Sequence, residues 1–305
     1  MKTTDGSSFH STSGSEPQTP GRELSSSRGP EGGHRTAFVL SGGGSLGAVQ
    51  VGMLHALLEA GIWPDLVVGS SVGAINGAYL AGHASLEGVE QLAVLWESIR
   101  RRDVFPLGLR AVLGGILGRR AHFADPLGLR TLILRAELGF GRVEEAPVPF
   151  YPVATDLATG DAVVLREGDV VEALLASAAI PGVFPPVEIR GRTLVDGGVV
   201  ADSPLAQAEA LGATTIYLLP TASAEDGVLP GGAIDVAARA LFLSANQTAE
   251  ATIATLATRL EVHVVPPPAA TSHSIFEFGQ TTELIDGGYL RALAWLEDRS
   301  SSLVA

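Results

Sequence analysis

The sequence predicts an α/β protein in which helices cover both faces of a mostly parallel sheet. Short apolar runs typical of buried strands alternate with longer helical patterns, and turns rich in glycine and serine join them. Strand–turn–helix units in series favour a parallel sheet, because each helix carries the chain back to start the next strand in the same direction. With 305 residues, 46% of them hydrophobic, the chain is long enough for one large domain with a substantial core.

The individual elements follow from the order of these patterns. We expect strands at residues 36–40, 65–69, 147–155, 161–165, 192–195, 214–219 and 261–265. We expect helices at about 48–59, 72–81, 85–101, 170–179, 234–256 and 283–296. One more helix should start at Ser203-Pro204, since serine is a common cap and proline suits the first helical position. An Asp-Gly-Gly sequence at 286–288 falls within or before the last helical pattern, and we predict a turn there.

The chain divides into a tail and a domain. Residues 1–35 are rich in Ser, Gly, Thr and Pro, so they bury too little surface to offset their ordering entropy. We therefore predict a disordered tail over 1–35 and one domain over 36–300. The tail lacks the apolar core of a signal peptide. The runs 36–58 and 66–86 carry no charge, but internal glycines and serines favour strand–turn–helix over a membrane span. A cytoplasmic protein without a transmembrane helix is expected.

Composition excludes several kinds of chemistry. A formal net charge of -13 would repel phosphate, so we expect no nucleic-acid partner. Cysteine is absent, which removes disulfides, a thiolate nucleophile and Cys-ligated zinc. The only lysine is Lys2, in the polar tail, so neither a P-loop lysine nor a Schiff base is available. We predict no cofactor and no metal site.

A candidate nucleophile lies between the second strand and its helix. Gly69-Ser70-Ser71-Val72-Gly73 fits the pattern G-x-S-x-G, in which the serine occupies a sharp strand-to-helix turn. Glycine is needed on either side because the backbone is crowded there. An ordinary turn in which Ser71 merely caps the helix is the alternative.

The glycine run after the first strand has two interpretations. Gly42, Gly43 and Gly44, with Gly47, fit the dinucleotide pattern G-x-G-x-x-G, but no acidic residue ends the second strand as that function requires. Alternatively, the bare N–H groups of the glycines hold the oxyanion of a tetrahedral intermediate. Neighbouring parallel strands would then place this oxyanion hole beside Ser71.

Two kinds of base are conceivable for Ser71. In the common order Ser, acid, His, either His263 or His273 could serve, though neither has a distinctive setting. Asp196 has a better one, since it ends a strand and Gly197-Gly198 let other backbone approach it closely.

These motifs, in this order, resemble patatin-like phospholipases of the bacterial type. Two further blocks fit the same family, Ala154-Thr155-Asp156-Leu157 and the stretch from Ala176 to Pro186, so that the resemblance covers about residues 36–205. It implies a three-layer α/β/α sandwich, a Ser71–Asp196 catalytic dyad without histidine, and an oxyanion hole at Gly42, Gly43 and Gly44. Many members carry Arg or Lys where this chain has Leu46.

The family resemblance implies a serine lipid acyl hydrolase: a phospholipase A, lysophospholipase or carboxylesterase that works through an acyl-serine. A Ser-His-Asp esterase and a catalytically weak lipid-binding module are the alternatives. The partner expected is a lipid or fatty-acyl ester. Residues 98–120 carry six arginines and one acid, Asp103, which suggests peripheral contact with an anionic membrane; a packed amphipathic helix is the alternative for this segment.

Overall fold

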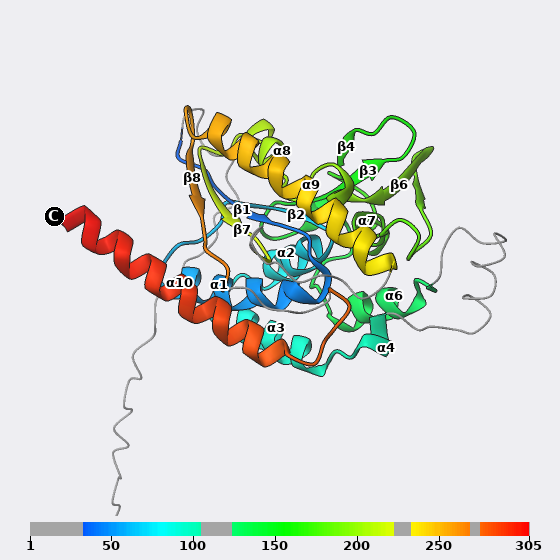
Figure 1. The fold of residues 1–305 in the computed structure, drawn as a ribbon, viewed down its shortest axis with the longest axis horizontal. Coiled ribbons are helices and arrows are strands. Elements are labelled where there is room, and N and C mark those ends of the chain that lie inside the picture. Colours follow the sequence, from blue (N-terminus) through cyan, green and yellow to red (C-terminus); the bar gives the residue numbers. More distant parts are fainter. Residues whose placement is uncertain (1–32, 105–123, 223–232, 269–274, 305) are drawn as a thin grey trace, which may run out of the picture. The chain divides into compact units, whose positions relative to one another are not determined.

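The computed structural model describes residues 33–104, 124–222, 233–268 and 275–304 (Figure 1). Three of the predictions lie wholly or partly outside these residues: the disordered tail, the base His273, and the part of the arginine-rich segment beyond residue 104. Within the described residues, none of the helices has the length and apolar character needed to cross a membrane.

The centre of the fold is an eight-stranded sheet of order β5-β6-β3-β2-β1-β7-β8, with β4 paired to β3. Strands β1, β2, β3, β7 and β8 run parallel, while β4, β5 and β6 form an antiparallel margin beside β3. The bounds are β1 Thr36–Leu40, β2 Leu66–Ser70, β3 Phe150–Asp156, β4 Ala162–Val164, β5 Val187–Ile189, β6 Arg192–Asp196, β7 Thr215–Leu219 and β8 Glu261–Val264.

Helices cover both faces of this sheet, with α8 and α9 on one face and α1, α2, α3 and α10 on the other (Figure 1). The bounds are α1 Ala48–Glu59, α2 Val72–Gly82, α3 Leu86–Ser98, α4 Arg101–Val104, α6 Leu127–Arg135, α7 Val170–Ser177, α8 Leu205–Ala210, α9 Ala233–Leu256 and α10 Thr281–Val304. Three single 3-10 turns complete the set, η1 Gly44–Gly47, η2 Val143–Glu145 and η3 Gly197–Val199.

The alternation along β1 shows why two helical layers are needed. Phe38 and Leu40 face a core shared with α1, α2 and α3, while Ala37 and Val39 face a second core shared with α8. All four residues are completely buried. A strand that is apolar on both faces must be covered on both, so the predicted three-layer α/β/α sandwich is confirmed.

The antiparallel margin contains elements that the sequence patterns did not predict. Strand β5 is only three residues long, and it pairs with β6 through the two-residue turn Arg190-Gly191. Both turn residues have positive φ angles, 53° and 75°, as the tight turns favoured in hairpins require. Helix α6, which lies outside this margin, was not predicted from the sequence either.

The Asp-Gly-Gly sequence at 286–288 does not form the predicted turn, because it lies inside α10. A methyl group on Gly288 would overlap the carbonyl oxygen of Val49, and one on Gly52 would overlap that of Ile285. These glycines therefore allow α1 and α10 to pack with their backbones close together.

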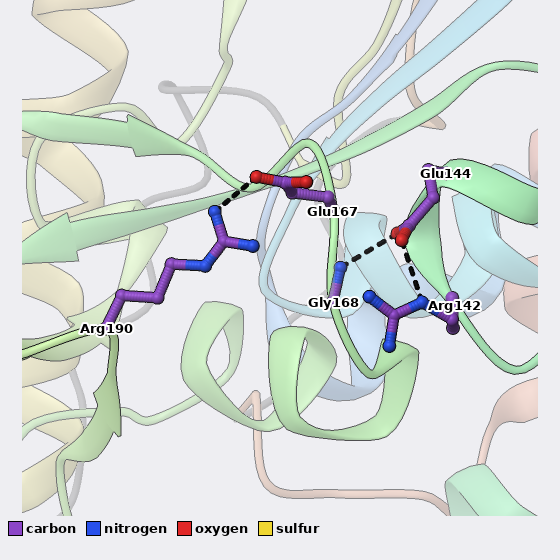
Figure 2. A network of polar contacts seen from close by, with 5 residues as sticks. All are labelled: Arg142, Glu144, Glu167, Gly168 and Arg190. Atoms are coloured by element: carbon purple, nitrogen blue, oxygen red, sulfur yellow. Dashed lines mark hydrogen bonds and ion pairs between the residues drawn. The ribbon is translucent and has the colours of Figure 1, made fainter.

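A polar network fixes the entry to α7, the helix that ends at the candidate site. Figure 2 shows Glu144 accepting hydrogen bonds from the Gly168 N–H and from Arg142, both at 2.8 Å, while Arg190 pairs with Glu167. Backbone N–H groups hold the pKa of Glu144 below its usual value. The network joins residues 142–144 to the turn before α7, so it helps to set where that helix begins.

Candidate active site

Ser71 occupies a strained turn between β2 and α2. Its φ and ψ angles are 53° and -124°, which non-glycine residues rarely adopt. A methyl group on Gly69 would overlap the carbonyl oxygen of Gly73, and one on Gly73 would overlap the carbonyl oxygens of Leu40 and Ser41. The glycine spacing that singled out Ser71 is thus a steric requirement of this turn.

The hydroxyl of Ser71 points away from the helix that follows it. Ser71 is the N-cap residue of α2, but its side chain makes no capping hydrogen bond. Instead, Ser71 Oγ donates to Asp196 Oδ2 at 2.6 Å, and both residues are buried. The structure therefore brings the predicted nucleophile and the predicted base into direct contact across 125 residues of sequence.

Asp196 is held at the end of β6 by backbone contacts. Its N–H donates to the carbonyl oxygen of Ala179 at 2.9 Å, and its own carbonyl accepts from Thr155 Oγ1 at 2.9 Å. The second carboxylate oxygen accepts from the Gly198 N–H at 2.7 Å. Burial raises the pKa of Asp196 to about 6, although the hydrogen bonds from Ser71 and Gly198 act in the opposite direction.

Ser177, at the last residue of α7, is a site residue that the sequence argument missed. Its Oγ accepts from the Ser71 N–H at 3.0 Å and donates to the carbonyl oxygen of Val153 at 2.6 Å. With Ala179 bonded to Asp196, the stretch 177–179 positions both partners of the Ser71–Asp196 pair. Ser177 lies in the sequence block from Ala176 to Pro186, which supported the family resemblance. Nothing in that block indicated a role for this serine.

The glycine turn lies beside Ser71, as expected for neighbouring parallel strands. A methyl group on Gly42 would lie 3.3 Å from Ser71 Cβ. The Gly42 N–H already donates to the carbonyl oxygen of Asp202 at 3.2 Å. Among the described residues, no protein acceptor is bonded to the N–H of Gly43 or Gly44. Donors for an oxyanion are therefore available at Gly43 and Gly44 and already engaged at Gly42.

A buried network of side-chain amides connects this turn to α2. Asn76 Nδ2 donates to the carbonyl oxygen of Gly47 and to Gln50 Oε1, both at 2.9 Å. Gln50 donates in turn to the carbonyl oxygens of Ser41 and Leu219, and Trp96 Nε1 donates to Asn76 Oδ1 at 2.9 Å. These bonds fix the backbone on both sides of the three glycines.

An apolar cavity opens onto Ser71. The space between its walls, open mouth included, is about 790 Å³. Helices α2, α3 and α6 supply half of the residues that line it. The lining residues include Val72, Ile75, Tyr79, Leu92, Leu95, Trp96, Ile99, Val104, Leu129, Leu132, Ala178, Ile180, Phe184 and Phe278. A long hydrocarbon group is the ligand chemistry that such a surface favours.

Comparison with known proteins decides the family. The model of the family described as patatin-like phospholipase matches residues 38–209, more than half of the chain. This chain belongs to the patatin-like phospholipase family.

Individual relatives agree with this family. An uncharacterized NTE family protein of Mycobacterium tuberculosis is 32% identical over 173 residues, 56% of this chain and 45% of that protein. Lysophospholipase nte1 of Aspergillus terreus is 30% identical over 210 residues, 65% of this chain and 13% of that protein. The matched region thus spans less than half of either relative. The crystal structure of VipD from Legionella pneumophila aligns with a TM-score of 0.43 and 13% identity, covering 87% of this chain and 67% of that one.

Leu46 lies within the glycine turn, between Ser45 and Gly47. Its side chain is buried in the core shared with α1 and α2. Position 46 of the glycine turn therefore carries no cation.

Among the described histidines, none is bonded to Ser71 or Asp196. His263 lies on β8, three strands from β2, which at about 4.8 Å per strand is roughly 14 Å away. Its ring accepts from Arg299 at 2.8 Å and contacts Glu261, and burial lowers its pKa. Among the described residues, no group of three or more His, Cys, Asp or Glu side chains is arranged to hold a metal ion.

Proposed function

We propose that this patatin-like chain hydrolyses carboxylic esters of lipids, as a phospholipase A, lysophospholipase or carboxylesterase, through a Ser71–Asp196 dyad. The observation that carries the proposal is the 2.6 Å hydrogen bond from Ser71 Oγ to Asp196 Oδ2 at the edge of an apolar cavity. That distance lies within the range in which a base takes a proton from a nucleophile, about 2.6–3.2 Å.

The reaction has two halves. In the first, Asp196 takes the Ser71 proton while Oγ bonds to the ester carbonyl carbon, and the carbonyl π electrons move to oxygen. The intermediate collapses by breaking the bond to the alcohol oxygen, which receives the proton from Asp196. In the second half, Asp196 takes a proton from water, the resulting hydroxide attacks acyl-Ser71, and Ser71 leaves with the proton returned to it.

The charge that forms on the carbonyl oxygen needs hydrogen-bond donors. We assign this role to the N–H groups of Gly43 and Gly44, because Gly42 is engaged with Asp202. Losing one such donor typically costs about 3–4 kcal/mol in the transition state. The first turn of α2 adds the positive end of its helix dipole near Ser71.

The base and the cavity suggest which substrates suit the site. A carboxylate whose pKa is about 6 is a better base than an ordinary aspartate, yet it gives less driving force than a group matched to pH 7. We therefore expect esters to be cleaved more readily than amides. The acyl chain would occupy the apolar cavity, and Leu46 leaves no cation on the glycine turn for a lipid phosphate.

Contact with a membrane surface is the remaining part of the proposal. In α4, Arg101 and Arg102 are exposed, while Val104 lines the cavity. Arginines beside the cavity mouth would be attracted to anionic lipid head groups. Liposome co-sedimentation tests this with Arg101→Gln/Arg102→Gln: we expect weaker binding to anionic vesicles, and unchanged binding would contradict it.

Fluorophosphonate labelling beside an ester and phospholipid hydrolysis assay tests the dyad. We expect the wild type to label and to turn over, Ser71→Ala to do neither, and Asp196→Asn to lose most of both. Ser70→Ala is the matched control, because Ser70 is equally buried and its Oγ makes no hydrogen bond in the described structure. Activity that survives in Ser71→Ala would remove the proposed mechanism, and a wild type that neither labels nor hydrolyses would favour a lipid-binding module.

A further inference from the structure

A second carboxyl group lies at the site, and the mechanism above does not use it. Asp202 follows η3, and although the residue as a whole is half-buried, its carboxyl group points inward. A methyl group on Gly42 would overlap Asp202 Oδ1. One on Gly198 would lie 3.1 Å from Asp202 Oδ1 and 3.0 Å from Asp196 Oδ1, so the two carboxyl groups are within about 6 Å of each other.

Among the described side chains, little surrounds Asp202 that could neutralise a negative charge. The Gly42 N–H favours the ionised form, while Ser203 bonds to Ser41 rather than to a charged group. The charged group that acts on Asp202 among the described side chains is Asp196, which has the same sign. On the helices packed nearby, Glu209 of α8 is paired with Arg259, and the side chains of Asp235 and Arg239 in α9 lie outside the description. Burial and, to a lesser extent, Asp196 raise the pKa of Asp202 to about 7.

We propose that an ionised Asp202 opposes formation of the oxyanion, so that the titration of Asp202 sets the alkaline limit of turnover. This inference rests on the proposed dyad. During attack, negative charge leaves Asp196 and appears on the carbonyl oxygen beside Gly43 and Gly44. A negative charge on Asp202 favours this transfer if Asp202 is nearer to Asp196 than to the oxyanion. The same charge hinders the transfer if Asp202 is nearer to the glycine turn, where the oxyanion forms. Because Asp202 Oδ1 lies against Gly42 of that turn, we take the second case, in which an ionised Asp202 hinders the transfer.

The protonated form of Asp202 has no such effect. A neutral carboxyl group still fills the space between Gly42 and Gly198 without adding a second negative charge. The productive state therefore has Asp196 ionised and Asp202 protonated, with one charge shared between two acids. Because the groups are coupled, their titration belongs to the pair, and the profile should show two apparent pKa values.

The test compares pH profiles of kcat/KM for wild type and Asp202→Asn, with Asp161→Asn as an exposed control carboxylate. We expect a bell-shaped profile for wild type and for the control, and loss of the alkaline limb in Asp202→Asn. With an apparent pKa near 7, only about one tenth of the sites carry a protonated Asp202 at pH 8. The kcat/KM of wild type at pH 8 should therefore be roughly one tenth of its maximum, whereas that of Asp202→Asn should stay close to its own maximum. An alkaline limb that persists unchanged in Asp202→Asn overturns the proposal.

A stability measurement separates this inference from the dyad. A carboxyl group whose pKa is raised in the folded state destabilises that state as pH rises above its unfolded pKa. Asp202→Asn should therefore have a higher Tm than wild type at pH 8, and the difference should shrink toward pH 4. Equal or lower Tm for the variant at pH 8 overturns the placement of Asp202, whatever its turnover. Turnover that survives in Ser71→Ala would instead contradict the proposed dyad, and it would not affect the interpretation of the Tm measurement.

Discussion

Ser177 offers the sharpest test of how the nucleophile is held. Replacing it with alanine removes one hydroxyl group that serves two buried partners, the N–H of Ser71 and the carbonyl oxygen of Val153. Each buried polar group left unpaired costs about 1–3 kcal/mol. We therefore expect Ser177→Ala to lower the free energy of unfolding by about 2–6 kcal/mol.

Urea unfolding followed by tryptophan fluorescence measures this loss. Ser98→Ala is the control, because Ser98 is exposed and its hydroxyl donates to a single carbonyl oxygen, that of Leu95. The control should change stability by no more than about 0.5 kcal/mol. The variant should also lose turnover, since the strained Ser71 peptide is no longer anchored. A loss below about 1 kcal/mol in Ser177→Ala, with turnover intact, would refute the reasoning.

Three further predictions follow from the same geometry. Ser71→Gly should be more stable than Ser71→Ala by about 1 kcal/mol in thermal unfolding, because glycine accepts the positive φ and both variants lack the hydroxyl; equal stabilities would argue against strain. Ile75→Trp should reduce hydrolysis of long acyl esters far more than of acetyl esters by filling the cavity, whereas Val94→Trp, on the exposed face of α3, should change neither. Asp196→Asn should be about 3 kcal/mol more stable than wild type at pH 7, and its stability should be almost the same as that of wild type at pH 4. The reason is that burial raises the pKa of Asp196 to about 6, so the folded wild type loses stability as this acid ionises. A stability difference that does not vary with pH would contradict this.

The sequence sufficed for those parts of the site that obey local rules. The turn at Ser71 needs glycine two residues away on either side, and that requirement is visible in five consecutive letters. Asp196 was found because it ends a strand and is followed by two glycines. The contact between Ser71 and Asp196 then follows from the strand order, because β2, which precedes Ser71, and β6, which ends at Asp196, both pair with β3.

The parts that were missed depend on contacts without a local signature. Ser177 lies 106 residues from Ser71, and a serine at the end of an apolar helix looks like any other. Asp202 sits in a loop, where an aspartate is unremarkable until Gly42 is found against it. Nothing local in the sequence indicated that the Gly42 N–H would donate to the carbonyl oxygen of Asp202. Strand β5 was missed for a related reason, since three residues are too few to show an alternating pattern.

The site is built from features that each oppose folding, and the contacts around it show how the fold tolerates them. Ser71 holds a conformation that costs about 1–3 kcal/mol, and the buried Asp196 prefers to be neutral. Ser177 holds the backbone of Ser71 through a hydrogen bond, and the Gly198 N–H partly stabilises the charge of Asp196. If burial were compensated completely, the pKa of Asp196 would return toward 4 and the carboxylate would be a poorer base. In the proposed mechanism an Asp base without histidine therefore needs incomplete compensation, and the burial that costs stability would also make Asp196 the stronger base.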